Sequence, residues 1–144
     1  MLYNIPPVIS PKLMKTLMEM GHGDEIVLSD GNFPARSVND RLIRCDGLGV
    51  PELLDAIAPF FPLDYAVEYP VVMMETPPGA PKPPIWEVYR KILAERCKDA
   101  FNIQFIARQA FYERARQAFA VVATGEKARF ANILLKKGVV RFDD

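Results

Sequence analysis

The only histidine of the 144-residue chain, His22, lies between two glycines and is a candidate for proton transfer. Imidazole side chains titrate near physiological pH, so one in a turn with carboxylates nearby could exchange protons with a bound ligand. A structural interpretation is also open. Gly21 or Gly23 would then end a helix in the left-handed conformation, with His22 exposed or donating to the last carbonyls of that helix.

Polar residues at the ends of predicted strands and in turns could bind a hydroxylated ligand. Such a ligand needs hydrogen-bond acceptors, amide and guanidinium donors, and one titratable group. Besides the histidine, the candidates for these roles are Asp30, Asp64, Arg108, Tyr112 and Asn132. Arg108 and Tyr112 are i, i+4 neighbours on one face of a predicted helix. Each candidate also has a structural explanation, for example as a turn former or a surface cation, and spacing alone does not identify a sugar.

Several other chemistries lack the residues that they require. The sequence contains no glycine-rich phosphate loop, no G-x-G-x-x-G and no nucleophile elbow. One histidine and two widely separated cysteines, Cys45 and Cys97, are too few for a zinc site or a disulfide framework. We therefore expect no metal and no cofactor, and two free thiols in a reducing compartment.

Charge and hydropathy limit the partners. Eighteen basic and eighteen acidic residues cancel, so the charge gives no argument for nucleic acid, whereas near-zero net charge permits self-association. No segment approaches the roughly 20 apolar residues that cross a bilayer, and the N-terminus lacks the pattern of a signal peptide. We expect a cytoplasmic protein with neither a nucleic acid nor a membrane as its partner.

Hydrophobic periodicity predicts short strands that alternate with amphipathic helices. Helices are predicted at 11–20, 51–58, 85–93 and 108–115. Strands are predicted at 26–28, 42–47, 70–75, 103–106, 119–123 and 132–135, with a polar loop at 34–40. This alternation is typical of a layered α/β domain, and the close spacing of the last two strands indicates a mixed sheet. A chain of 16.2 kDa with 50% hydrophobic residues fits one domain, residues 1–144.

Blocks of sequence from the first predicted helix to the C-terminus resemble the L-fucose mutarotase and D-ribose pyranase family. The blocks are residues 20–26 (MGHGDEI) with Asp30, Phe33-Pro34, Asp46-Gly47, residues 111–115 (FYERA), 118–126 (AFAVVATGE) and 132–139 (NILLKKGV). Arg108 and the FYERA block are similar to the fucose branch rather than the ribose pyranase branch.

The resemblance implies an isomerase that interconverts the α and β anomers of L-fucose or a related aldose without a cofactor. It implies that His22 is the acid/base catalyst, with Tyr112 as a second proton relay. The positions implied to bind the monosaccharide are Asp30, Asp64, Arg108, Phe130 and Asn132. The family also implies a three-layer α/β/α fold with a mixed sheet of about six strands, and a ring-like homo-oligomer, often a decamer.

Phe130 departs from the family pattern. The fucose branch usually has a tyrosine two residues before the asparagine, and Phe130 keeps the ring but lacks the hydroxyl. One lost ligand hydrogen bond is worth roughly 0.5 to 1.5 kcal/mol, which alters sugar preference more readily than it abolishes chemistry. This position leaves the identity of the sugar open. It also favours the alternative function, a non-catalytic monosaccharide-binding oligomer.

His22 and Asp30 are too far apart in an extended chain to contact one sugar. The eight residues from one to the other could span up to roughly 26 Å at ~3.3 Å per residue. Either Gly23-Asp24 folds the chain back, or the two residues serve different places. We therefore hypothesise that the site lies at or near a subunit interface, with part of it supplied by a neighbouring subunit.

Overall fold

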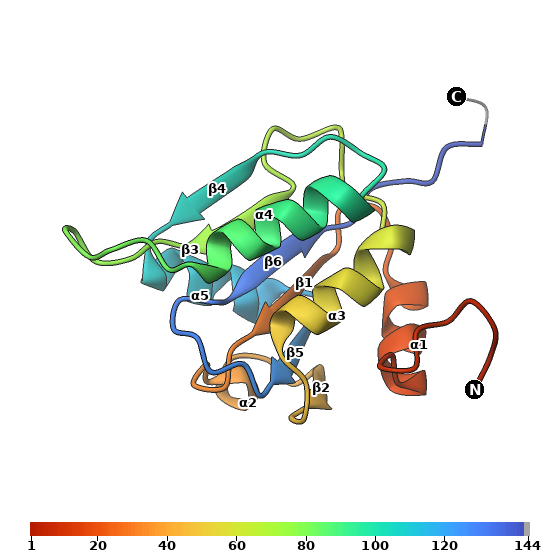
Figure 1. Ribbon diagram of the computed structural model, residues 1–144, viewed down its shortest axis with the longest axis horizontal. Coiled ribbons are helices and arrows are strands. Elements are labelled where there is room, and N and C mark those ends of the chain that lie inside the picture. Colours follow the sequence, from red (N-terminus) through yellow and green to blue (C-terminus); the bar gives the residue numbers. More distant parts are fainter. Residues whose placement is uncertain (143–144) are drawn as a thin grey trace.

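A mixed sheet of six short strands forms the centre of the structure, a computed structural model that describes residues 1–142 (Figure 1). The strands are β1 (Glu25–Ser29), β2 (Leu42–Cys45), β3 (Val71–Met74), β4 (Ile103–Ile106), β5 (Ala120–Thr124) and β6 (Ile133–Lys136). Their order across the sheet is β2-β5-β1-β6-β3-β4. β6 is antiparallel to both of its neighbours, and the other adjacent pairs are parallel. The predicted mixed sheet of six strands is confirmed.

Helices cover both faces of this sheet, so the molecule has three layers. The helices are α1 (Pro11–Glu19), α2 (Ala35–Val38), α3 (Val50–Ile57), the short 3-10 helix η1 (Ala58–Phe60), α4 (Ile85–Arg96) and α5 (Arg108–Gln117). In Figure 1, α3 and α4 lie in front of the sheet and α5 lies behind it. Residues 1–142 therefore form the predicted α/β/α arrangement.

Alternate residues of the central strand enter two separate hydrophobic clusters. Ile26 and Leu28 of β1 pack in a cluster with α1, α3 and α4, whereas Val27 packs with α2 and α5. All three side chains are fully buried. A strand buried on both faces has a continuous apolar sequence, which is why the sequence predicted β1 and β3 clearly.

The helix α2 is a difference from the sequence prediction, which placed a polar loop at 34–40. A single helical turn is too short to show hydrophobic periodicity. The turn is stabilised from outside, because the buried Asn39 amide donates to the carbonyls of Ala115 and Ala118 at 3.0 and 2.9 Å. Ala35 and Val38 are buried in the cluster beside α5. Tertiary contacts therefore decide the local structure here.

Gly125 follows β5 directly and lies against the turn after β2. A Cβ atom at this position would lie 2.1 Å from the carbonyl oxygen of Asp46, a contact that requires a backbone shift. Gly125→Ala should therefore lower the free energy of unfolding by about 2 kcal/mol, as measured by urea denaturation. Gly47→Ala is the control, since a Cβ there meets nothing within 4 Å, and it should cost less than about 0.5 kcal/mol. Equal stability of the two variants would contradict the close approach.

Candidate sugar site

Five of the seven predicted site residues line one pocket of about 200 Å³. They are Asp30, Arg108, Tyr112, Phe130 and Asn132. The pocket lies where β1 and β3 end and where α5 and β6 begin. In α/β proteins, the carboxyl ends of parallel strands are the usual place for a ligand, because the loops there present polar groups from several elements. The fold thus brings together residues that are up to 102 positions apart.

Asp30 is the acidic residue among those that line this pocket, and 6% of its surface is exposed. Its carboxylate accepts hydrogen bonds from the backbone N–H groups of Asn32 at 3.0 Å and Ala131 at 3.4 Å. Its own N–H donates to Oδ1 of Asn132 at 2.8 Å. Burial raises the pKa of the Asp30 carboxyl, and hydrogen bonds to it partly oppose that shift. The carboxylate is therefore a stronger proton acceptor than a solvated aspartate.

Arg108 and Tyr112 lie one turn apart at the start of α5, as their i, i+4 spacing predicted. Arg108 is exposed, and Tyr112 is half-buried with its ring packed edge-on against Phe33, at 5.4 Å between centroids. Phe111, between them in the sequence, is fully buried in the cluster under α5. Burial of Phe111 fixes which face of α5 packs on the sheet, and thereby which way Arg108 and Tyr112 face.

Phe130 and Asn132 approach the pocket from the segment before β6. Phe130 has a φ of 55°, in the left-handed region that a bulky side chain rarely adopts. Asn132 is buried, and its amide oxygen is engaged with the Asp30 backbone. Backbone strain of this kind costs of order 1 to 3 kcal/mol and persists only where the surroundings impose it.

His22 and Asp64 lie at the opposite end of β1 and form a pair of their own. Nε2 of the half-exposed His22 lies 3.2 Å from Oδ1 of the buried Asp64. The Asp64 carboxylate also accepts from the backbone N–H of Ala66 at 3.1 Å. The intervening strand β1 has five residues and spans roughly 16 Å. Within one chain, the structure therefore does not bring His22 to the pocket of Asp30.

The end of β6 positions both members of the His22–Asp64 pair. The backbone of Lys137 accepts from Gly23 N–H and donates to the carbonyl of Asp24, each at 2.8 Å. On the other side, Asp64 N–H donates to the Lys136 carbonyl at 3.1 Å. The left-handed helix cap considered for Gly21 or Gly23 is wrong, because α1 ends at Glu19 and its cap, Met20, is extended. Gly23 is left-handed with φ 87°, but in the turn that leads into β1.

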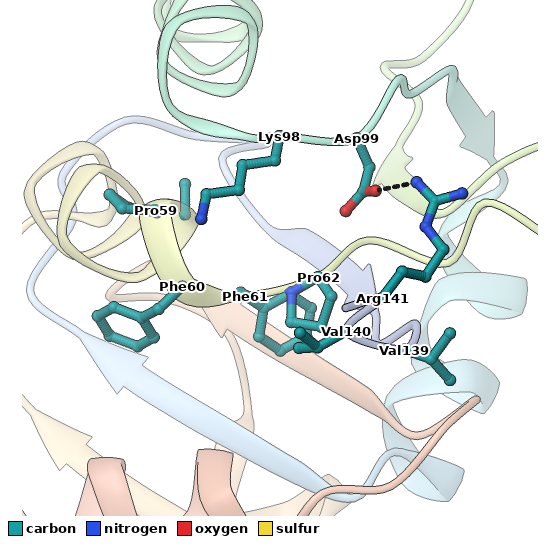
Figure 2. Close-up of a pocket in the computed structure, with 10 residues that line it drawn as sticks. Pro59, Phe60, Phe61, Pro62, Lys98, Asp99, Val139, Val140 and Arg141 are labelled. Atoms are coloured by element: carbon teal, nitrogen blue, oxygen red, sulfur yellow. Dashed lines mark hydrogen bonds and ion pairs between the residues drawn. The ribbon is translucent and has the colours of Figure 1, made fainter. Parts of the chain in front are cut away.

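A second cavity, of about 240 Å³, lies between η1 and the segment after β6 (Figure 2). Figure 2 shows the ion pair of Asp99 and Arg141 on one side and Lys98 reaching toward Pro59 on the other. The Arg141 guanidinium also lies 4.3 Å over the ring of Tyr65, the neighbour of Asp64 in the sequence. Among the described residues, none of the seven predicted site residues lines this cavity.

The remaining wall of the Asp30 pocket consists of residues that the sequence analysis did not assign to the site. They are Asn32, Phe33, Met74 and Arg129. Met74 is the last residue of β3, and Phe33 follows β1 by four positions. Proximity to the carboxyl end of a predicted strand was thus the signal that could have found Asn32, Phe33 and Met74. Arg129 adds a second guanidinium beside that of Arg108.

The fold and the pocket define an α/β protein with a small polar ligand site at the carboxyl ends of its strands. A model of the RbsD/FucU transport protein family matches residues 3–140. An L-fucose mutarotase from Actinobacillus pleuropneumoniae serotype 5b (strain L20) is 47% identical over 140 residues, 96% of this chain and 97% of that protein. The chain therefore belongs to the RbsD/FucU family, which confirms the resemblance found in the sequence.

Two solved structures are similar along nearly the whole chain. The fucose mutarotase from Streptococcus pneumoniae, in complex with L-fucose, has a TM-score of 0.93 and 51% identity, covering 97% of this chain and 100% of that one. FucU from Bifidobacterium longum has a TM-score of 0.90 and 47% identity, covering 95% and 100%. In the described part of this chain, no helix is long and apolar enough to cross a membrane.

The raised pKa of Asp30 predicts a pH-dependent stability difference. Because burial raises this pKa above 3.8 in the folded state, ionisation of Asp30 costs stability as the pH rises through the folded value. Asp30→Asn removes that ionisation, so its stability relative to the wild type should be higher at pH 7 than at pH 4. Urea denaturation at both pH values measures the difference.

Asp40→Asn is the matched control, since the Asp40 side chain is 95% exposed and pairs with Arg36 at the surface. We expect it to show little change between the two pH values. A relative stability of Asp30→Asn that falls from pH 4 to pH 7 would contradict a raised pKa.

Proposed function

We propose that this chain is an isomerase of the L-fucose mutarotase type, which interconverts the α and β anomers of L-fucose or a related aldose. The observation that carries the proposal is the pocket in which a carboxylate, a guanidinium, a phenol and an amide converge from three separate segments. Relatives 47–51% identical over nearly their whole length are named fucose mutarotases. We infer that residues 1–144 form one mutarotase domain that acts in the cytoplasm.

Mutarotation needs only proton transfers. The anomeric hydroxyl loses a proton, the ring oxygen gains one, and the bond between C1 and the ring oxygen breaks to give the open-chain aldehyde. Rotation about the bond to C1 and closure on the other face, with the proton movements reversed, give the second anomer. Each well-placed acid or base contributes typically ~10²- to 10⁴-fold, which is sufficient for a reaction that already proceeds in water.

The site residues divide into proton-transfer and positioning groups. We assign His22 to proton exchange with the ring or anomeric oxygen, and Asp64 to orienting its imidazole through the 3.2 Å contact. The Tyr112 hydroxyl is the second relay. The groups that orient the sugar hydroxyls are those of Asp30, Arg108 and Asn132, and the Phe130 ring offers an apolar face to the C–H groups of the sugar.

The separation of His22 from the pocket supports a site shared between two subunits. A neighbour would insert its His22–Asp64 end into the pocket mouth of this chain. Apolar side chains are exposed near that end, as expected of a surface covered by another subunit: Tyr65, Val67, Val139, Val140 and Phe142. A head-to-tail contact of this kind forms a closed ring where the rotation between successive subunits closes, and an open filament where it does not. We propose a closed homo-oligomer, which the family resemblance describes as a decamer.

The exchange of anomeric protons in NMR tests the function directly. With L-fucose, the wild type should accelerate interconversion of the two anomers, and His22→Ala should lose about 100-fold or more of that acceleration. The variant should still bind L-fucose, because the pocket of Asp30 is intact. Exchange with D-ribose and related aldoses then defines the sugar preference.

Two outcomes would contradict the proposal. Binding of L-fucose by the wild type without any acceleration would support the alternative, a non-catalytic sugar-binding oligomer. Full activity of His22→Ala would remove the imidazole from the mechanism. Lys15→Ala serves as a control, since Lys15 lies on the exposed side of α1 and pairs with Glu19 of the same helix.

A further inference from the structure

Two aromatic residues of α4 hold the segment that carries Phe130 and Asn132. The indole Nε1–H of Trp86 donates to the carbonyl of Phe130 at 2.8 Å, and the hydroxyl of Tyr89 donates to the carbonyl of Ala131 at 2.7 Å. Trp86 is 7% exposed and Tyr89 is fully buried. Neither side chain is among the residues that line the pocket, whereas Phe130 and Asn132 are. Two consecutive carbonyls of one loop are thus fixed from a helix outside the pocket.

The loop needs such support because Phe130 is left-handed, with φ 55°. A phenylalanine in this region is strained, and it relaxes unless neighbouring groups impose the conformation. The Trp86 hydrogen bond acts on the carbonyl of the strained residue itself. The indole is in turn packed against Phe105, with 4.5 Å between ring centroids. The donor is therefore held in one orientation.

The conformation of Phe130 determines where two pocket groups lie. It sets the direction of the Phe130 ring, which lines the pocket. It also sets the path to Asn132, whose amide oxygen accepts from the N–H of Asp30. Loss of the Trp86 hydrogen bond to the Phe130 carbonyl would therefore move the Phe130 ring and the Asn132 amide, although the indole itself does not line the pocket.

We propose that Trp86 is a positioning residue that sets sugar affinity and sugar preference by holding Phe130 and Asn132 through the Phe130 carbonyl. The inference rests on the proposed mutarotase function. The two ends of the site then have different roles. Trp86 of α4 affects how the sugar is bound, and the His22–Asp64 pair carries out proton transfer. Loss of the Trp86 donor should therefore change KM more than kcat.

Trp86→Phe tests the claim, because it removes the indole N–H and keeps an aromatic ring against Phe105. We expect the KM for L-fucose to rise about 2- to 10-fold, the effect of one lost hydrogen bond, with kcat changed less than about twofold. The ratio of kcat/KM for L-fucose to that for D-ribose should shift as well. Tyr89→Phe, which removes only the second donor, should act in the same direction. Tyr3→Phe is the matched control, because Tyr3 is 98% exposed.

A readout without sugar separates this inference from the proposed function. In Trp86→Phe, the N–H of Asp30 should lose protection from hydrogen exchange, since its acceptor Asn132 is released, while amides of β5 keep theirs. A second readout uses added sugar: Trp86 is the only tryptophan, so its indole N–H signal in the wild type is unique and should shift when L-fucose is added.

The outcomes are distinct. An inactive wild type overturns the proposed function, and the protection of Asp30 N–H then still decides whether Trp86 holds the loop. The inference would be overturned if both variants kept the wild-type KM, the wild-type ratio of kcat/KM for L-fucose to that for D-ribose, and the wild-type protection of the Asp30 N–H from hydrogen exchange. An equal fall in kcat for every sugar, with KM unchanged, would also overturn it, because that result describes general damage. Should Trp86→Phe fail to fold, the same measurements on Tyr89→Phe decide.

Discussion

The pairing of β6 with β1 and β3 is the constraint on which the rest of the structure depends. At its start, Asn132 accepts from the backbone of Asp30 and closes the pocket. At its end, Lys137 pairs with the turn of His22 and Lys136 with the backbone of Asp64. One strand therefore fixes both clusters of candidate residues, and it also keeps them apart. Because hydrogen bonds along the sheet set that separation, side-chain motion cannot bring His22 to the pocket in a single subunit.

The site combines two features that oppose stability. Asp30 is buried with a raised pKa, and Phe130 has a left-handed backbone. Both are supported by hydrogen bonds from groups outside the pocket wall: the Asp30 carboxylate accepts from the backbone N–H of Ala131, and the Phe130 carbonyl accepts from the indole of Trp86. These hydrogen bonds are made within the chain without a ligand, so they order the pocket residues in advance. Binding free energy is then not consumed in ordering the site.

Much of this fold could be predicted from the sequence because buried strands have continuous apolar runs, as in Val71–Met74. The order of the strands could not be predicted, since it depends on pairings between distant segments, such as Ile26 with Ala120. The helix α2 was missed because contacts with α5 stabilise it. Family resemblance, more than spacing, supplied the candidate residues. The role of Trp86 depends on a contact across 44 positions that no local pattern indicates.

The central claim is that one subunit supplies His22 to a pocket of another, and complementation between two inactive variants tests it most directly. His22→Ala and Asp30→Asn would be co-expressed in equal amounts, and anomer exchange of L-fucose measured. Random mixing in a head-to-tail ring leaves about one quarter of the sites with both groups intact, so about one quarter of wild-type activity should return. His22→Ala with Asp64→Asn, both changed at the same end of the chain, should recover none. Absence of recovery in the first mixture, with mixed oligomers present, would contradict a site shared between subunits.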